Sequence, residues 1–296
     1  MKRITASDII HVMDENNKAA MAICCGETFA VETANPGIPD ETFQKDYTKT
    51  PFPKRILTIT GPIYVEGAEP GDILCVHIDD IKLNAEGKMW MGQWMGILMD
   101  EVDHCYMRKA RVENGTVIFR EDVRFPAKPM IGTIGTAPAG KPIDCLYPGA
   151  HGGNMDALNA KAGSIVYLPV NVAGAMLSIG DVHAAMGYGE VLGTGIEIGS
   201  TVTAHVTLLK GRAQKHPVIE TEEHFEIVVS GEDMPELCKE ATREAIRFVA
   251  AHGNYDFDEA YALVGQTSDL KILQVVNPWY TISMDIPKWI LMKKEY

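Results

Sequence analysis

The spacing of hydrophobic and polar residues predicts β-strands along most of the chain. Short runs rich in β-branched residues alternate with Gly, Pro, Asn and Asp, a pattern typical of strands joined by tight turns. The clearest expected strands are residues 56–60, 73–81, 116–119, 164–170, 191–198 and 200–209. In the last of these, Val202, Ala204, Val206 and Leu208 fall on one face of the strand, so we expect that face to be buried.

Two helices are expected near the end of the chain. Over residues 235–252 apolar side chains recur at spacings of three and four, which predicts an amphipathic helix. Pro235 suits the first turn of this helix and Gly253 suits its end. A shorter helix is predicted over residues 258–264, with Asp258 as its N-cap.

The turn signals and the lack of a linker indicate a single domain. Asn114-Gly115 lies between two apolar runs and predicts a two-residue hairpin turn, because both residues accept a positive φ. No low-complexity segment, repeat or linker interrupts residues 1–296, so we expect one compact domain. The predicted fold is mainly β within the α+β class, with strands in a sandwich or barrel-like arrangement and two late helices.

Charge and composition narrow the possible partners. The chain has 296 residues, 46% of them hydrophobic, with 40 acidic against 27 basic side chains and a net charge of -13. Such a charge repels nucleic acid and anionic membrane surfaces, whereas a neutral or cationic substrate or a metal cation fits it. No run of ~18 apolar residues is present, so no membrane span is expected.

The cysteines and the N-terminal residues indicate an intracellular protein. No Cys-x-x-Cys pair occurs, so the cysteines are expected to be reduced and mostly buried. They are Cys24, Cys25, Cys75, Cys105, Cys145 and Cys238. Charged residues interrupt the first apolar stretch, which is unlike a signal peptide, and we therefore expect a cytoplasmic location.

Two glycine-rich segments, residues 151–156 and 180–190, concentrate side chains that bind metals or transfer protons. Asp181 and His183 stand two positions apart, so on an extended segment they point to the same face and could reach one cation. Glu190 follows a Gly-x-Gly turn that could fold it back toward the same point as a third ligand or a base. Such a set with an open position lowers the pKa of bound water towards ~7.

Each of these residues also has an ordinary structural interpretation. Asp181 and His183 could simply form a hydrogen bond that closes a loop. Asn154 and Asp156 are commonly turn-formers that bond their own backbone, and His151 could be a loop histidine. No Gly-x-Ser-x-Gly elbow or His-Glu-x-x-His zinc helix occurs elsewhere to compete with the two segments.

The same segments resemble a known family. GGNMD at residues 152–156 and GDVHAAMGYGE at residues 180–190 are similar to the two signature stretches of the acetamidase/formamidase family. Further likeness covers residues 59–83, 162–181, 261–264 and 268–291, and so nearly the whole chain. The resemblance implies a β-rich fold peculiar to the family and hydrolysis of formamide, acetamide or a related small amide to a carboxylate and ammonia.

By position, the resemblance implies that Asn154, Asp156, Asp181, His183 and Glu190 line the pocket. One residue departs from the family pattern. Where the family usually has Asp between the two glycines, this chain has Tyr188. A tyrosine, with an ordinary pKa of about 10, does not replace a carboxylate as a ligand of a hard cation at neutral pH.

The expected chemistry combines a cation with a proton carrier. A divalent metal held by Asp181, His183 and Asp156 would polarise the amide carbonyl or activate water, and zinc is the first expectation, with calcium or manganese as alternatives. Glu190 is the expected general base. Further catalytic candidates are Asp156 and His151, and the substrate-binding candidates are Asn154, Gly152, Gly153 and Tyr188. A metal-free route with a carboxylate base and an oxyanion hole, which backbone N–H groups near Gly152, Gly153 or Gly187 would form, stays open.

Two other classes of function fit the same residues. A metal-dependent isomerase or lyase of a small carbonyl compound could use the same ligands, and a non-catalytic small-molecule-binding β module would use the Asp-His pair structurally. A homo-oligomer, in the first instance a dimer, is expected from exposed strand edges and the methionine-rich residues 89–99, although this segment could equally be core. Asp100, Asp103 and His104 follow it, and surface roles suit them best.

Overall fold

The computed structural model describes residues 1–34, 57–292 and 296, and most of them form β-sheet. The largest sheet has nine strands. Their spatial order is β1 (Lys2–Ile4), β5 (Phe29–Thr33), β18 (Ser200–Leu209), β7 (Ile73–Leu83), β16 (Ile165–Pro169), β19 (Val218–Glu220), β20 (His224–Gly231), β22 (Tyr280–Pro287) and β21 (Asp269–Gln274). In β18, residues 200, 202, 204 and 206 are buried and the residues between them are half-buried, which confirms the predicted alternation.

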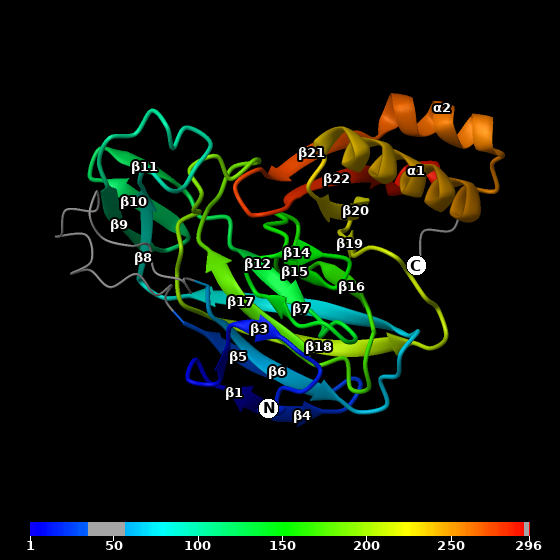
Figure 1. Cartoon of the computed structure of the whole chain (residues 1–296), viewed down its shortest axis with the longest axis horizontal. Helices are drawn as coiled ribbons and strands as arrows, with labels where there is room; N and C mark the ends of the chain where they lie inside the picture. The colour runs from blue at the N-terminus through cyan, green and yellow to red at the C-terminus, as the bar shows by residue number, and fades with distance from the viewer. Residues whose placement is uncertain (35–56, 293–295) are drawn as a thin grey trace.

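A second sheet of seven strands carries the segments with candidate chemistry. Its order is β14 (Pro148–Gly149), β15 (Gly152–Asn154), β12 (Met130–Gly135), β17 (Leu177–His183), β6 (Ile59–Val65) and β2 (Ile9–Ile10), and β4 (Met21–Ile23) also pairs with β6. The run expected at residues 56–60 thus becomes β6, which begins only at Ile59, and residue 56 lies outside the described ranges. Figure 1 shows β12, β15 and β17 in the middle of the molecule.

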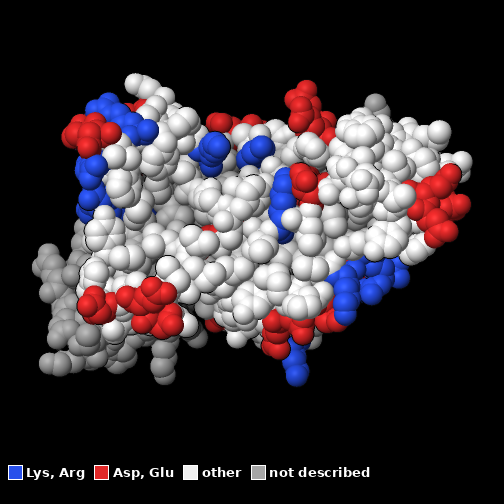
Figure 2. All heavy atoms as spheres, turned by 90° about the horizontal axis from the view of Figure 1, so that it is seen from above, with Lys and Arg blue, Asp and Glu red and all other residues white. Residues whose placement is uncertain are grey.

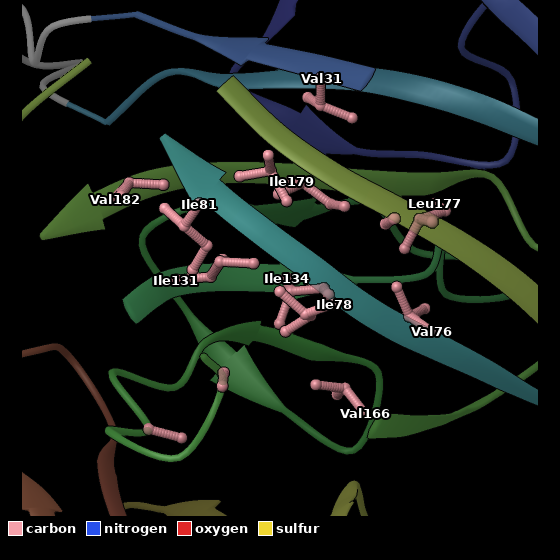
Figure 3. Packing of buried hydrophobic residues seen from close by; sticks show 14 of the residues in the cluster. Val31, Val76, Ile78, Ile81, Ile131, Ile134, Val166, Leu177, Ile179 and Val182 are labelled. Atoms are coloured by element: carbon pink, nitrogen blue, oxygen red, sulfur yellow. The ribbon is translucent and has the colours of Figure 1, made fainter. Parts of the chain in front are cut away.

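The two sheets pack face to face around a hydrophobic core. Val31, Val76, Ile78, Ile81 and Val166 of the nine-stranded sheet face Ile131, Ile134, Leu177, Ile179 and Val182 of the seven-stranded sheet (Figure 3). All ten side chains are buried. This layered packing is typical of a β-sandwich and confirms the expected mainly β class.

A four-stranded sheet stands at one end of the molecule (Figure 1). Its order is β11 (Val123–Pro126), β10 (Thr116–Arg120), β9 (Tyr106–Glu113) and β8 (Glu86–Met91), while β13 (Ile143–Asp144) pairs with β3 (Val12–Met13) elsewhere. Asn114 and Gly115 have φ of 49° and 73° and join β9 to β10, so the predicted hairpin is confirmed.

Helices α1 (Met234–Gly253) and α2 (Phe257–Thr267) lie at the other end, where α1 packs on β20 and β22. The longer helix matches the prediction. The shorter one begins earlier than expected, because Asp256 rather than Asp258 is its N-cap and exchanges two hydrogen bonds with Glu259 in a capping box. A short 3-10 helix, η3 (Lys288–Ile290), follows β22.

The predicted strand at residues 191–198 is wrong. This segment is irregular and makes only isolated bridges, from Glu197 to Lys88 and to His183. Ile196 and Ile198 are buried because they lie against Gly87 of β8, whereas Val191 is 57% exposed. Gly193, whose φ is 88°, approaches Met95 so closely that a methyl group there would lie 2.8 Å from Met95 Cγ. Burial without a ladder partner therefore imitated a strand pattern.

The cysteine prediction also needs correction. All six cysteines are free, but Cys24 and Cys25 are exposed and only Cys75 and Cys145 are fully buried. Among residues 89–99, Trp90 is 2% exposed, whereas Ile97 is 55% exposed, so neither the core nor the partner interpretation describes the whole segment.

The surface charges are mixed on the face seen from the side of α1, α2 and β11. Figure 2 shows acidic and basic side chains interspersed there, without a continuous basic area of the kind that binds nucleic acid. Asp100, Asp103 and His104 are exposed, as expected. Within the described part of the chain, no helix is long and apolar enough to span a membrane.

Candidate active site

The end of β17 supplies the centre of the site. Asp181 and His183 come from this strand, and their side chains meet, with His183 Nε2 lying 3.6 Å from Asp181 Oδ1. The same nitrogen lies 3.1 Å from Glu197 Oε1. The ligand atoms of these three residues lie within 4.8 Å of one another. The spacing argument for the Asp181/His183 pair therefore agrees with the geometry.

Two further acids approach His183 from other segments. Asp156 lies two residues after the end of β15, and Glu190 follows a tight turn in which its N–H donates to Gly187 O at 3.1 Å. With His183 they form a second group whose ligand atoms lie within 4.8 Å of one another. Four buried carboxylates thus surround one imidazole.

Three of the four acids have an unusual backbone conformation. Asp156, Asp181 and Glu190 have φ of 50°, 56° and 44°, in the left-handed region that side chains other than glycine seldom adopt. Each such residue costs of order 1–3 kcal/mol, and strain of this kind concentrates at functional sites. The fold therefore holds these carboxylates in place against a local cost.

Gly132 of β12 makes room for the converging acids. A methyl group at this position would lie 2.7 Å from Asp156 Oδ1 and 2.8 Å from Asp181 Oδ2, closer than real contacts allow. A methyl group on Gly195 would likewise lie 2.6 Å from the ring of His183. Only glycine lets the backbone approach the cluster so closely at either position.

Neutral side chains orient the acids. Asn277 Nδ2 donates to Asp156 Oδ2 at 2.7 Å and lies 3.3 Å from Asn154 O. The Thr133 hydroxyl lies 2.7 Å from Asn154 Oδ1 and 3.1 Å from Asp181 Oδ2, and it donates to one of them at a time. Gly195 N donates to Glu197 Oε1 at 2.9 Å.

Burial raises the pKa of three of the acids. For Asp156, burial is the largest cause and the charge of Asp181 adds to it. For Glu190, burial and the charge of Asp156 raise the pKa well above the ordinary value. Burial also raises the pKa of Glu197, because the nearby charge of His183 offsets it only in part.

Asp181 and His183 shift as an ion pair does. Burial by itself would raise the pKa of Asp181, but contact with His183 outweighs burial and lowers it. Burial would lower the pKa of His183, but Glu197 and Asp181 outweigh it and raise that pKa well above its ordinary value. Strongly shifted groups gathered at one point are characteristic of functional sites.

Part of the cluster lines a cavity of about 350 Å³. The polar lining residues include Asn154, Asp181, Glu190, Glu197 and Asn277, and the apolar ones include Leu57, Trp90, Trp94, Met95, Met99, Leu146, Val276 and Pro278. A cavity lined by apolar side chains and a few polar groups is typical of a small-molecule site.

Other predicted residues lie apart from the cluster. His151 is 3% exposed, belongs to neither group of ligand atoms and does not line the cavity. Gly152 and Gly153 lie inside β15, paired with β12 and β14, and are also absent from the cavity wall. Their proposed catalytic and substrate-binding roles stay predictions without geometric support.

Tyr188 lies outside the group of acids as well. Its side chain is 46% exposed, and the Lys271 ammonium stands 5.4 Å from its ring centre. Neither group of candidate ligands includes residue 188. The departure from the family pattern therefore removes no member of the cluster described here.

Glu197, Asn277 and Thr133 were missed from the sequence. Glu197 stands between Ile196 and Ile198, so a charged residue inside an apolar run was the available signal. Because a strand was expected over residues 191–198, Glu197 was not expected at the site. Asn277 and Thr133 carry no comparable signal, since their contacts come from distant segments.

The site has the chemistry to hold a cation. His183 Nδ1, Asp156 Oδ1 and Glu197 Oε2 are buried and have no hydrogen-bond partner among the described residues. Buried polar atoms are nearly always satisfied, so a cluster of unsatisfied acceptors around a histidine fits a bound metal ion. Fold and site together define a β-sandwich protein with a buried acidic cluster around a histidine, beside a cavity.

Comparison with known proteins gives the family. The Acetamidase/Formamidase family model matches residues 13–146 and 142–292, so the chain belongs to this family. It is similar to the crystal structure of an acetamidase from Bacillus halodurans, with a TM-score of 0.91, 36% identity and coverage of 96% of this chain and 97% of that chain.

A second solved structure agrees. A predicted acetamidase/formamidase from Thermoanaerobacter tengcongensis has a TM-score of 0.92 and 34% identity, with coverage of 98% of this chain and 96% of that chain. The chain spans about half the length of the curated relatives that it matches. One of them, an acetamidase of Mycolicibacterium smegmatis, is 29% identical over 224 residues, which are 54% of this chain and 55% of that protein.

Proposed function

We propose that this protein hydrolyses the C–N bond of a primary amide and releases a carboxylate and ammonia. Family membership supports this reaction, because the relatives are named acetamidase and formamidase. The observation that carries the proposal is the convergence of four acids on His183 beside a cavity. The four acids are Asp156, Asp181, Glu190 and Glu197. Amide hydrolysis needs such a set, since resonance makes the carbonyl a poor electrophile and the amine a poor leaving group.

Glu190 is the proposed general base. Its carboxylate lines the cavity, and its raised pKa suits a group that takes a proton from water and passes it to the departing nitrogen. Asp156 lies beside Glu190, and a hydrogen bond from Asn277 orients its carboxylate. We therefore assign Asp156 a positioning role rather than proton transfer. Asn154 lines the cavity and has a side chain able to hydrogen-bond the carboxamide.

The unsatisfied atoms of the cluster fit a divalent cation. Asp181, His183 and Glu197 would hold it, so Glu197 takes the place first expected for Asp156. A bound cation would supply polarisation of the carbonyl and acidification of water. Zinc is proposed first because a histidine nitrogen suits it, with manganese or calcium as alternatives for the oxygen-rich surroundings.

Ammonia release tests the proposal. Purified protein would be incubated with formamide, acetamide, propionamide and phenylacetamide, before and after dialysis against a chelator and with zinc, manganese or calcium restored. Ammonia and the matching carboxylate in equal amounts are expected, with activity lost on chelation and regained with metal. Absence of ammonia from every amide under all conditions would overturn amide hydrolysis and favour an isomerase, a lyase or a binding module. Activity that survives chelation would overturn only the cation.

A further inference from the structure

The cavity beside the acids is larger than formamide or acetamide would fill. It measures about 350 Å³. A water molecule occupies about 30 Å³ in the liquid, so an amide of about four non-hydrogen atoms fills roughly a third of this space. Cavities of about 300 Å³ or more ordinarily take ligands of larger size. Most of the volume is therefore available to something other than a carboxamide group.

Many of the residues that line this cavity are apolar. They include Trp90 of β8, Trp94 and Met95 from the segment that follows β8, and Val276 and Pro278. Of the carboxylates of the site, those of Asp181, Glu190 and Glu197 line the cavity. A molecule that fills the cavity would therefore have a polar end at these acids and an apolar body against the apolar side chains.

Close backbone contacts hold this wall in place. A methyl group on Gly96 would lie 2.6 Å from Leu192 O, so the wall segment presses directly on the loop that carries Glu190. Ile97 N donates to Val191 O at 2.9 Å and fixes the same approach. A wall fixed to the catalytic loop is preorganised, which lets apolar contact contribute to affinity without an ordering cost.

We propose that the substrate is a primary amide with a bulky apolar acyl group, of the size of an arylacetyl group, that packs against Trp94 and Met95. This inference rests on the proposed amide hydrolysis. The carboxamide lies at the acids and the acyl body fills the apolar volume. One methylene in a hydrophobic pocket changes specificity by about 10-fold or more, so several such groups distinguish large from small amides.

A second hollow offers a competing place for the acyl group. It measures about 620 Å³ and is lined by Phe125, Met186 and Tyr188 on the other side of the same loop. It shares Glu190 and Thr194 with the first cavity, but Asp181, Glu197 and Asn154 line only the first. An amide whose carboxamide group contacts these residues lies in the same cavity as Trp90 and Trp94, which favours the first cavity for the acyl group.

The test is a series of amides against wild-type protein and three variants. Values of kcat/KM would be measured for acetamide, isobutyramide and phenylacetamide with the wild type, Trp94→Ala, Trp94→Phe and Phe125→Ala. The wild type should prefer phenylacetamide over acetamide by at least about 10-fold. Trp94→Ala should remove that preference, Trp94→Phe should restore part of it, and Phe125→Ala should leave it unchanged.

Failure of the two proposals can be told apart. If no amide is hydrolysed, the proposed reaction fails, and the amides are then stable enough for dissociation constants to be measured by calorimetry on the same proteins. The same order of affinities would still support the bulky ligand. A wild type that prefers acetamide, in turnover or in binding, would overturn it, as would loss of the preference in Phe125→Ala instead of Trp94→Ala.

Discussion

Two groups of buried carboxylates lie in the described part of the chain, and they differ in what neutralises them. Glu226 of β20 and Asp285 of β22 stand directly opposite each other on neighbouring strands. Lys271 of β21 forms an ion pair with Asp285, and the Ser283 hydroxyl donates to Glu226 at 2.7 Å. This pair therefore has a cation and a donor from its own sheet.

The site cluster is built differently. It holds four carboxylates, and the ion pairs that the described residues make with them run through His183 alone. One histidine does not neutralise four acids. Both groups leave buried carboxylate oxygens without hydrogen-bond partners among the described residues, so the two groups differ in the ratio of acids to cations. Burying uncompensated charge is costly, so a protein that keeps such a cluster keeps it for a ligand or a reaction. The first group is a structural acid pair within one sheet, whereas the second group is suited to bind a ligand or to take part in a reaction.

The largest expected effect compares one glutamate from each group. Glu190→Gln should lower kcat/KM for amide hydrolysis by about 10²–10⁴-fold, because a general base contributes that much. Glu226→Gln, equally buried but in the other group, should leave kcat/KM within about 2-fold of wild type. Steady-state ammonia release with circular dichroism as a folding control measures both. Equal loss in the two variants would remove the distinction between the groups.

The next prediction concerns His151, a buried histidine that, unlike His183, has no acid beside it. Burial lowers the pKa of His151 from 6.5 to about 4. The unfolded chain takes up this proton below about pH 6.5 and the folded chain does not, so the free energy of unfolding should fall by about 3 kcal/mol between pH 6.5 and pH 4.

His151→Gln should remove this part of the pH dependence. Urea unfolding of both proteins at pH 7.5 and pH 4.5 would measure the change, and the variant should lose less stability on acidification than the wild type. The same variant tests the predicted catalytic role of His151. Activity within a few-fold of wild type at pH 7.5 would assign this residue to packing, whereas a loss of 100-fold or more, on the order of a lost catalytic acid or base, would restore it to the mechanism.

Removing the cation from the structural pair should have a smaller effect. Lys271→Met leaves Asp285 buried without its ion pair and should lower the free energy of unfolding by about 2 kcal/mol, the loss of a hydrogen bond to a charged group. The exposed pair Lys239–Glu236 on α1 supplies the control, since Lys239→Met should leave the free energy of unfolding nearly unchanged. Similar costs for both would show that Lys271 does not neutralise a buried acid.

The smallest expected effect is a gain in stability. Burial, with the charge of Asp285, raises the pKa of Glu226 above its ordinary value of 4.5. The folded state therefore favours the neutral acid, and its contribution to stability is lost as the pH rises above 4.5. Glu226→Gln should match wild type at pH 4 and exceed it by below about 1 kcal/mol at pH 8, the range for like charges opposite each other in a sheet. Thermal unfolding at both pH values measures this, and a gain at pH 4 alone would contradict it.

Much of the fold was accessible from local patterns. The alternation in β18, the Asn114-Gly115 hairpin and helix α1 follow from side-chain period, positive φ and amphipathic spacing, which neighbouring residues determine. The strand predicted over residues 191–198 is wrong, because Ile196 and Ile198 are buried by contact with β8 while the segment makes only isolated bridges.

The sequence by itself determined which faces are buried, where α1 runs, and that Asp181 and His183 share one side of a strand, since these depend on residues close together in the chain. The tertiary structure decided which distant acids join them. It brought in Glu197 and Asn277 and excluded His151 and Tyr188 from the cluster. It also placed Trp90 and Trp94 around the cavity that the acids line. The reason is physical: pairing between segments far apart depends on how sheets pack and where glycines such as Gly132 permit close approach, and neither is encoded in the spacing of neighbours.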